Sequence, residues 1–282
     1  MTDHGAHAAH DPVGAIIVLA ALGGLAFGSY LVAVARSRRR GRAWSRWRTV
    51  SFAAGAVLPL IAVVPALSPY PGGSFADHMW QHLLIGMVAP VLLVLGAPGT
   101  LAVRALSVVG ARRLTRALRS RPAVALTRPV VALVLNLGGL AALYFTPLHA
   151  LTTQSAAVHH LVHVHFFLAG TLFAWVIAGP DPAPHRPSVP ARLVVLGVAV
   201  AGHAVLSQLL YAGLGAVDAP ADDLRAGASL MYFGGDLAEL ALAFALVASW
   251  QPTPGRARVR RPAASTTQEA GGNPREGGPS WT

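Results

Sequence analysis

Two pairs of histidines have a spacing that suits metal binding. His78 and His82 are four residues apart, and so are His159 and His163. Residues four apart lie on one face of an α-helix, so each pair would present two imidazoles to the same side. Imidazole nitrogen is a ligand for copper, zinc, iron and nickel. Two such pairs on facing helices would supply up to four ligands to one ion.

Neighbouring side chains favour copper as that ion. The thioethers of Met79 and Met87 would add a preference for Cu(I). His160 and His203 are additional candidate ligands. Zinc is the alternative metal, because imidazole suits it equally. The competing interpretation is that histidines at a membrane interface form hydrogen bonds with headgroups or neighbouring helices and hold no metal.

Two acidic residues interrupt an otherwise apolar segment. Asp236 and Glu239 lie near the middle of the run at 226–250. A carboxylate within a membrane is costly unless it pairs with a polar group or stays protonated. We therefore expect both side chains to face other helices. There they would orient a ligating imidazole, bind the metal themselves, or hold two helices together through a hydrogen bond.

The elements that carry these residues are predicted to be membrane helices. Of the 282 residues, 54% are hydrophobic and only 12% are charged. A bilayer core about 30 Å thick needs roughly 20 apolar residues per helix. We predict an all-α, polytopic integral membrane protein, because a lipid-exposed backbone must satisfy its own hydrogen bonds. The seven expected transmembrane helices cover about 12–35, 50–67, 79–97, 123–146, 157–178, 190–212 and 226–250.

The arginines predict the orientation of these helices. All 22 basic residues are arginine, and they concentrate in alternate connections at 36–48, 104–128 and 186–192 and in the tail after 255. The positive-inside rule places these segments in the cytoplasm, with the N-terminus outside and the C-terminus cytoplasmic. Eleven of the twelve histidines then fall on the outer side. The candidate site is therefore expected to open to the outside.

Three segments flank or connect the transmembrane domain, which is expected to span 12–250. Residues 1–11 form an outer tail with His4, His7 and His10, which would capture metal loosely or serve as a solvated spacer. The segment at about 99–121 mixes apolar residues with arginines and is predicted to lie as an amphipathic helix on the cytoplasmic surface. Residues 251–282 are rich in Pro, Gly, Ser and Thr, which predicts a disordered cytoplasmic tail.

Composition excludes several classes of protein. The absence of cysteine excludes disulfides, iron–sulfur clusters and thiolate copper sites, and the absence of lysine excludes a retinal Schiff base. There is no HExxH motif of a gluzincin-type protease. The net charge is +11, and the arginines that produce it lie in the connections that determine membrane topology. We therefore expect contacts with membrane lipid and none with nucleic acid. A haem site built on His149 and His163 is disfavoured, because the segment after His149 looks like a loop.

Three blocks carry a resemblance to a known family. They are HMWQHLLIGMVAPVLLVLGAP at 78–98, HHLVHVHFFLAGTLFAWVIAGPDPAPHR at 159–186 and DDLRAGASLMYFGGDLAEL at 222–240. In sequence and in order they resemble the cytochrome c oxidase assembly factor CtaG family of bacterial caa-type oxidases. The resemblance covers roughly residues 50–250. The third block departs from the family pattern, since DDLRAGASLMY replaces a DQQ-like element followed by an LMW-like one.

The resemblance implies a multi-pass, non-enzymatic assembly factor in the bacterial plasma membrane. Its partner would be the catalytic subunit of cytochrome c oxidase, and its cargo would be copper for the CuB centre. The two histidine pairs match the family's functional positions. Asp222 or Asp223 and Met231 of the third block come next and would support the ligands.

Two other functions remain open from the sequence. A copper permease would need polar residues that continue through the inner halves of the helices. A seven-helix zinc hydrolase of the ceramidase type would need three histidines around zinc and an open fourth position for water. For the hydrolase, Asp77 and the clustered histidines fit loosely.

Overall fold

The computed structural model describes residues 12–181, 183 and 186–250, and every regular element within them is helical. The predicted outer tail, the C-terminal tail and His185 lie outside the described residues. The elements are α1 (Pro12–Arg39), α2 (Arg46–Val63), η1 (Pro65–Leu67), α3 (Phe75–His82), η2 (Leu83–Val88), α4 (Ala89–Leu95), α5 (Pro98–Ala105), α6 (Val108–Leu118), α7 (Arg121–Leu126), α8 (Pro129–Phe145), α9 (Leu148–Gln154), α10 (Ala156–Ala178), α11 (Val189–Tyr211) and α12 (Ala221–Ala248).

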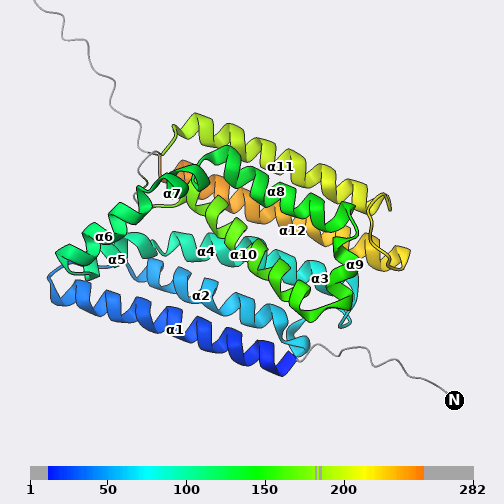
Figure 1. The fold of residues 1–282 in the computed structure, drawn as a ribbon, viewed down its shortest axis with the longest axis horizontal. Coiled ribbons are helices and arrows are strands. Elements are labelled where there is room, and N and C mark those ends of the chain that lie inside the picture. Colours follow the sequence, from blue (N-terminus) through cyan, green and yellow to red (C-terminus); the bar gives the residue numbers. More distant parts are fainter. Residues whose placement is uncertain (1–11, 182, 184–185, 251–282) are drawn as a thin grey trace, which may run out of the picture. The chain divides into compact units, whose positions relative to one another are not determined.

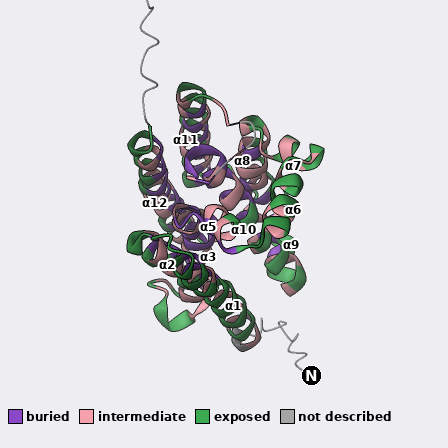
Figure 2. Ribbon diagram, turned by 90° about the vertical axis from the view of Figure 1, so that its left-hand side faces the viewer, coloured by how far each residue is buried: buried purple, intermediate pink, exposed green. Residues whose placement is uncertain are grey.

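The long helices lie side by side, and α10 runs through the middle of them (Figure 1). Helix α10 packs against α4 and η2 on one side and against α8 on the other, while α11 and α12 pack on each other. Helix α1 lies at the edge and contacts mainly α2 and α5. Figure 2 shows the outer side of α1 exposed, and Leu25 on that side is 71% exposed. An apolar face without a protein partner suits contact with lipid tails.

The predicted span at 79–97 is a single rod made of three segments, α3, η2 and α4, which together cover Phe75–Leu95. The middle segment is a π-helix, a wider turn that often occurs at functional sites. Helix α10 crosses this segment with glycine facing glycine, because a Cβ added at Gly170 would overlap the carbonyl oxygen of Gly86. The close approach brings α10 against the rod that carries His78 and His82.

Five helices are long and apolar enough to span a membrane, and the bent pair α8 and α9 makes a sixth if it counts as one span. The predicted all-helical fold with several candidate membrane spans is therefore confirmed, whereas the number seven is not. The difference is α2, an 18-residue helix that begins with Arg46 and contains Arg48 and Pro59. These residues lower its mean hydropathy, although α2 packs alongside α1 and α4 like the other long helices.

The arginine-rich segment after α4 forms three short helices, α5, α6 and α7, and not one amphipathic helix. Each break has a local cause. The chain is extended at Leu106, Ser107 then caps α6 by accepting a hydrogen bond from the Gly110 amide, and Pro122 stands in the first turn of α7. Asp181 fixes the start of α5, since its carboxylate accepts hydrogen bonds from the amides of Gly99 and Thr100.

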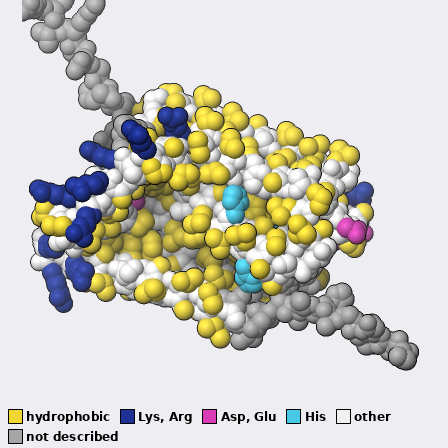
Figure 3. All heavy atoms as spheres, viewed as in Figure 1, with side chains coloured by type: hydrophobic (Ala, Val, Ile, Leu, Met, Phe, Trp, Pro, Cys, Tyr) yellow, Lys and Arg dark blue, Asp and Glu magenta, His cyan; other side chains and the backbone are white. Residues whose placement is uncertain are grey.

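The two ends of the molecule differ in charge. Figure 3 shows arginines gathered at one end, around α5, α6 and α7, and few charged side chains, of both signs, at the other. We call the first the arginine end. The second, where α3 and α10 begin and α9 lies, we call the histidine end. Between them the surface is largely hydrophobic, as expected for a flank in contact with lipid.

Candidate metal centre

Four imidazoles gather at the histidine end, and we call them the imidazole cluster. They are His78 on α3, His149 on α9, and His159 and His163 on α10. The ring centre of His78 lies 5.3 Å from that of His149, 6.1 Å from that of His163 and 6.3 Å from that of His159. The rings of His159 and His163 are 4.4 Å apart. The consecutive helices α9 and α10 therefore meet the distant helix α3 at His78.

Local sequence explains why these rings meet. Ser74 caps α3 and Ser155 caps α10, so both helices begin within a turn of their first histidines. Because both helices begin at the same end of the molecule, His78 and His159 lie at similar depth. Residues Thr146 and Pro147 separate α8 from α9, and the two helices bend by 74° there. That bend turns α9 across the end of the bundle.

His149 corrects one expectation from the sequence. The segment LHALTTQ is helix α9 and not a loop, and His149 is buried at 9% exposure against Phe75, Tyr144 and His78. Its spacing did not predict a place in this cluster, because no second histidine stands four residues away. The bend before α9 brings it into the cluster.

Tyr144 lies next to the imidazole cluster. Although it is close to the end of α8, its side chain is fully buried. Its hydroxyl shares a hydrogen bond of 3.0 Å with Nε2 of His78. Its ring also lies edge-on to Phe75 and His82. Tyr144 therefore sits beneath the imidazole cluster and fixes the orientation of the His78 ring.

His163 has the arrangement that metal ligands commonly show. Its Nδ1 donates a hydrogen bond of 3.1 Å to the carbonyl oxygen of His159, which leaves the lone pair on Nε2. Nε2 is buried and has no hydrogen-bond partner among the described residues. Ligating histidines usually donate their other ring N–H to a carbonyl or carboxylate in this way. A buried nitrogen without a partner is costly unless something binds it.

His82 lies one helical turn deeper than His78. Its ring packs edge-on against Phe166 at 4.6 Å, and its Nδ1 is buried without a partner in the described chain. It lies near His163 on α10 and near His203 on α11. His78 and His82 therefore share a helix face, as predicted, but only His78 belongs to the imidazole cluster.

A second group of polar residues lies deeper, and we call it the deep polar group. It comprises His203 on α11 with Asp236 and Glu239 on α12. His203 is 3% exposed and packs against α12 at Gly235, where an added Cβ would overlap the ring. Neither ring nitrogen of His203 has a hydrogen-bond partner in the described part of the chain, and neither does Oε2 of Glu239. The prediction that these acidic residues face other helices holds for Glu239, which is buried, while Asp236 is half-buried.

The remaining candidates lie elsewhere. His160 is exposed, and its Nδ1 donates to the carbonyl of Ala156. Met79 and Met231 are fully buried in one hydrophobic cluster with Phe75, Leu143 and Ala228. Asp222 is exposed and pairs weakly with Arg225 at 4.0 Å. Across the described residues, no three His, Asp or Glu side chains form a ready-made metal site, so the four imidazoles are neighbours that have not yet converged on a point.

Asp223 anchors the helix that carries His78. Its two carboxylate oxygens accept hydrogen bonds from the amides of Phe75, at 2.7 Å, and Ala76, at 3.0 Å. These amides belong to the first turn of α3, where the chain has no other acceptor for them. Of the two adjacent aspartates, Asp223 is therefore the one that joins α12 to the start of α3.

We expect Asp223→Ala to destabilise the protein by about 1–2 kcal/mol, the usual cost of removing a helix cap. The matched control is Asp222→Ala, which alters an exposed neighbour and should change stability by no more than about 0.5 kcal/mol. Equilibrium unfolding of the purified protein in detergent checks both values. Equal losses in the two variants would contradict the anchoring role.

Sequence comparison matches residues 28–252 to the cytochrome c oxidase caa3 assembly factor family, Caa3_CtaG. The chain belongs to this family. The match includes every histidine of the imidazole cluster and the whole of the deep polar group. The resemblance seen in the three sequence blocks is thereby confirmed, and the family is one of oxidase assembly factors.

Mycobacterial proteins are among the relatives of this family member. Uncharacterized proteins of Mycobacterium bovis and Mycobacterium tuberculosis are each 35% identical over 199 residues, which are 68% of this chain and 29% of the relative. One from Mycobacterium leprae is 30% identical over 251 residues, which are 82% of this chain and 38% of the relative. The chain thus spans about a third of the length of the curated relatives it matches. No solved structure matches it significantly.

Proposed function

We propose that the chain carries copper as a transient cargo during assembly of a haem-copper cytochrome c oxidase. Membership of the assembly factor family supports the process. The main observation in favour of copper is the imidazole cluster. Within it, Nδ1 of His163 donates a hydrogen bond to the His159 carbonyl, while the buried Nε2 of the same ring has no partner among the described residues.

The chemistry of the cluster suits copper and suits release. Imidazoles bind copper well, and the chain has no thiolate that would hold the metal more tightly. The four rings are close but do not form a closed site. A carrier that must hand its metal to a partner benefits from such an incomplete ligand set, because ligands from the partner can enter as its own leave.

In this proposal the other candidate residues are either further copper ligands, packing residues or supports for their neighbours. His82 lies between the imidazole cluster and the deep polar group and is the next ligand if the metal moves inward. His203 and Glu239 would follow, since each has a buried polar atom without a partner in the described chain. Met79 and Met231 serve packing, because both lie in an apolar cluster. Asp236 and Asp223 would support their neighbours.

We infer that the arginine end faces the cytoplasm of a bacterial plasma membrane and the histidine end faces outward, with seven spanning helices once α2 is included. Copper would then be captured and released at the outer face. The partner at that face would be the catalytic subunit of the oxidase, and the metal would be destined for its CuB centre.

The packing of the arginine half argues against a copper permease. Beyond Glu239, the space between α10, α11 and α12 is filled by large apolar side chains, among them Phe173, Ile177, Leu196 and Leu242. A permeation path would need ligands or water there. In this proposal Asp77 has a structural role in place of the one a zinc hydrolase would need, because its carboxylate oxygens accept hydrogen bonds from Ser68 and Gln81.

The test is an anaerobic Cu(I) titration of the purified chain against a chromogenic chelator, with zinc as competitor, beside oxidase assembly in a strain that lacks the chain. We expect one Cu(I) per chain, little displacement by zinc, and loss of CuB from the oxidase of that strain. Absence of Cu(I) binding would overturn the copper role even if assembly still failed. Tight retention of zinc in place of copper would favour the hydrolase.

A further inference from the structure

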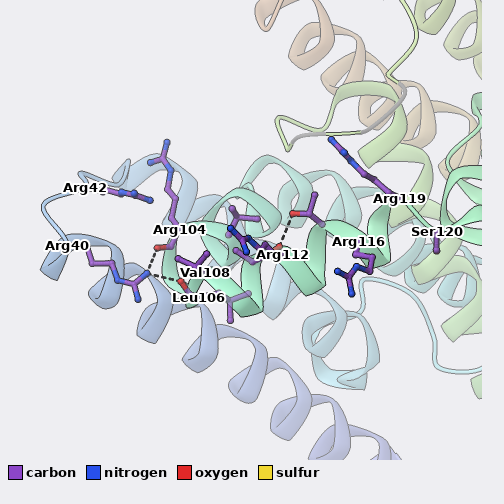
Figure 4. Close-up of a pocket in the computed structure, with 12 residues that line it drawn as sticks. Arg40, Arg42, Arg104, Leu106, Val108, Arg112, Arg116, Arg119 and Ser120 are labelled. Carbon is purple, nitrogen blue, oxygen red and sulfur yellow. Dashed lines mark hydrogen bonds between the residues drawn. The ribbon is translucent and has the colours of Figure 1, made fainter.

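A basic groove lies at the arginine end, between the end of α1, α5 and α6 (Figure 4). Its volume is about 840 Å³. Its walls combine six arginines with apolar side chains, notably Val103, Leu106 and Val108. The six are Arg40, Arg42, Arg104, Arg112, Arg116 and Arg119.

Two of these arginines make contacts within the protein. Arg40 donates to the carbonyl oxygens of Arg104, at 2.8 Å, and Leu106, at 2.9 Å, and so ties the end of α1 to the end of α5. The guanidinium of Arg104 stacks over the ring of Trp44 at 5.5 Å. These contacts set the width of the groove, because they hold α5 against α1.

The other four arginines have no side-chain partner among the described residues. The ion pair that the described residues do form, between Asp222 and Arg225, lies at the histidine end and not at the groove. Arg112 and Arg116 lie on α6, Arg119 is its C-cap, and Arg42 lines the groove from the segment after α1 (Figure 4). Four positive charges that share a groove without a counter-charge favour a polyvalent anion.

Arginine is also the side chain best matched to phosphate. Its planar guanidinium donates two parallel hydrogen bonds to phosphate oxygens. A single phosphate monoester or diester engages one or two such groups. Four free arginines therefore suit a ligand with two phosphates better than a ligand with one.

The apolar wall indicates that this ligand is a lipid. Val108 at the mouth of the groove is 68% exposed, and Val109 beside it is 59% exposed. Valines open to water at a charged groove would be unfavourable, whereas acyl chains passing over them would bury their surface. The groove also adjoins the exposed apolar side of α1, which suits the hydrocarbon region.

We infer that this groove is a binding site for the headgroup of an anionic phospholipid with two phosphates, whose acyl chains lie along α1 and α6. The lipid would neutralise the arginines and hold α6 flat on the membrane. This role is independent of copper, since the groove and the imidazole cluster are at opposite ends of the molecule.

The experiment measures lipid binding to the full chain in detergent by native mass spectrometry. The probes are diphosphatidylglycerol, phosphatidylglycerol, phosphatidylcholine and inorganic pyrophosphate. We expect diphosphatidylglycerol to bind with one-to-one stoichiometry and at least tenfold more tightly than phosphatidylglycerol, with phosphatidylcholine weakest. Arg112→Gln with Arg116→Gln should weaken diphosphatidylglycerol by about 30-fold, from the usual contribution of each basic residue near an anionic surface.

The matched control is Arg38→Gln with Arg113→Gln, which removes the same charge from the same end but from residues that do not line the groove. It should keep wild-type affinity within about threefold, because charges outside a site act only through screened solvent. Both pairs are exposed, and size-exclusion profiles verify that each variant folds. Equal losses in the two variants, no preference over phosphatidylcholine, or equally tight binding of pyrophosphate would each overturn the lipid site.

Discussion

His163→Ala is expected to abolish stoichiometric Cu(I) binding. The substitution removes the buried Nε2 that has no partner in the described chain and leaves the other three imidazoles in place. Altering even the hydrogen-bond partner of a metal ligand commonly costs about 10–100-fold in affinity, so losing the ligand itself should weaken Cu(I) by at least about 100-fold. Chelator competition under anaerobic conditions measures the change.

The control for this prediction is His160→Ala, three residues earlier on the same helix. Its ring is exposed, and its Nδ1 is occupied by the Ala156 carbonyl. We expect it to bind Cu(I) as the wild type does. If His163→Ala also kept wild-type affinity, the imidazole cluster would not be the copper site. X-ray absorption of the copper-loaded protein gives an independent count of imidazole ligands, which should fall by one in His149→Ala.

Gly170→Ala is expected to be the most destabilising small substitution in the bundle. The added methyl group would overlap the carbonyl oxygen of Gly86, so α10 must move away from the π-helical segment η2. Overpacking of this kind usually costs about 1–3 kcal/mol, and here neither partner is a flexible side chain that could yield. Because His163 lies on α10 and His78 lies on the rod that contains η2, we also expect weaker Cu(I) binding.

Gly197→Ala on α11 is the matched control. No atom outside its own helix lies within 4 Å of the added Cβ. Replacing a helical glycine in open space should stabilise the protein by roughly 0.5–1 kcal/mol. Equilibrium unfolding in mixed detergent measures both variants. If Gly170→Ala were as stable as Gly197→Ala, the glycine contact between α10 and η2 would be wrong.

Much of the architecture could be predicted because apolar length and charge placement determine membrane helices. The runs around 157–178 and 190–212 match α10 and α11 within one residue at each end. The π-helical segment could not be predicted, since LLIGMV reads as part of one apolar run and nothing in its composition shows that a turn will widen. The three-part break at α5, α6 and α7 was also missed, although Ser107 and Pro122 were visible signals for it.

The candidate site was predicted in part. Spacing identified His78, His159 and His163, because residues four apart on a helix share a face at any depth. Spacing could not identify His149 or Tyr144, because their positions depend on the bend between α8 and α9. For the same reason the sequence could not separate Asp223, which anchors α3, from Asp222, which faces solvent. Their difference arises from a contact with a residue 148 positions away.

That contact also sets an order of events during synthesis. Synthesis begins at the N-terminus, so α3 is made long before α12. The amides in the first turn of α3 therefore lack the Asp223 carboxylate until α12 has been made. The nascent chain therefore enters the membrane with His78 on an unfastened helix. Only when the last helix has been inserted is that histidine held in place, which makes the arrangement of the imidazole cluster a property of the finished bundle.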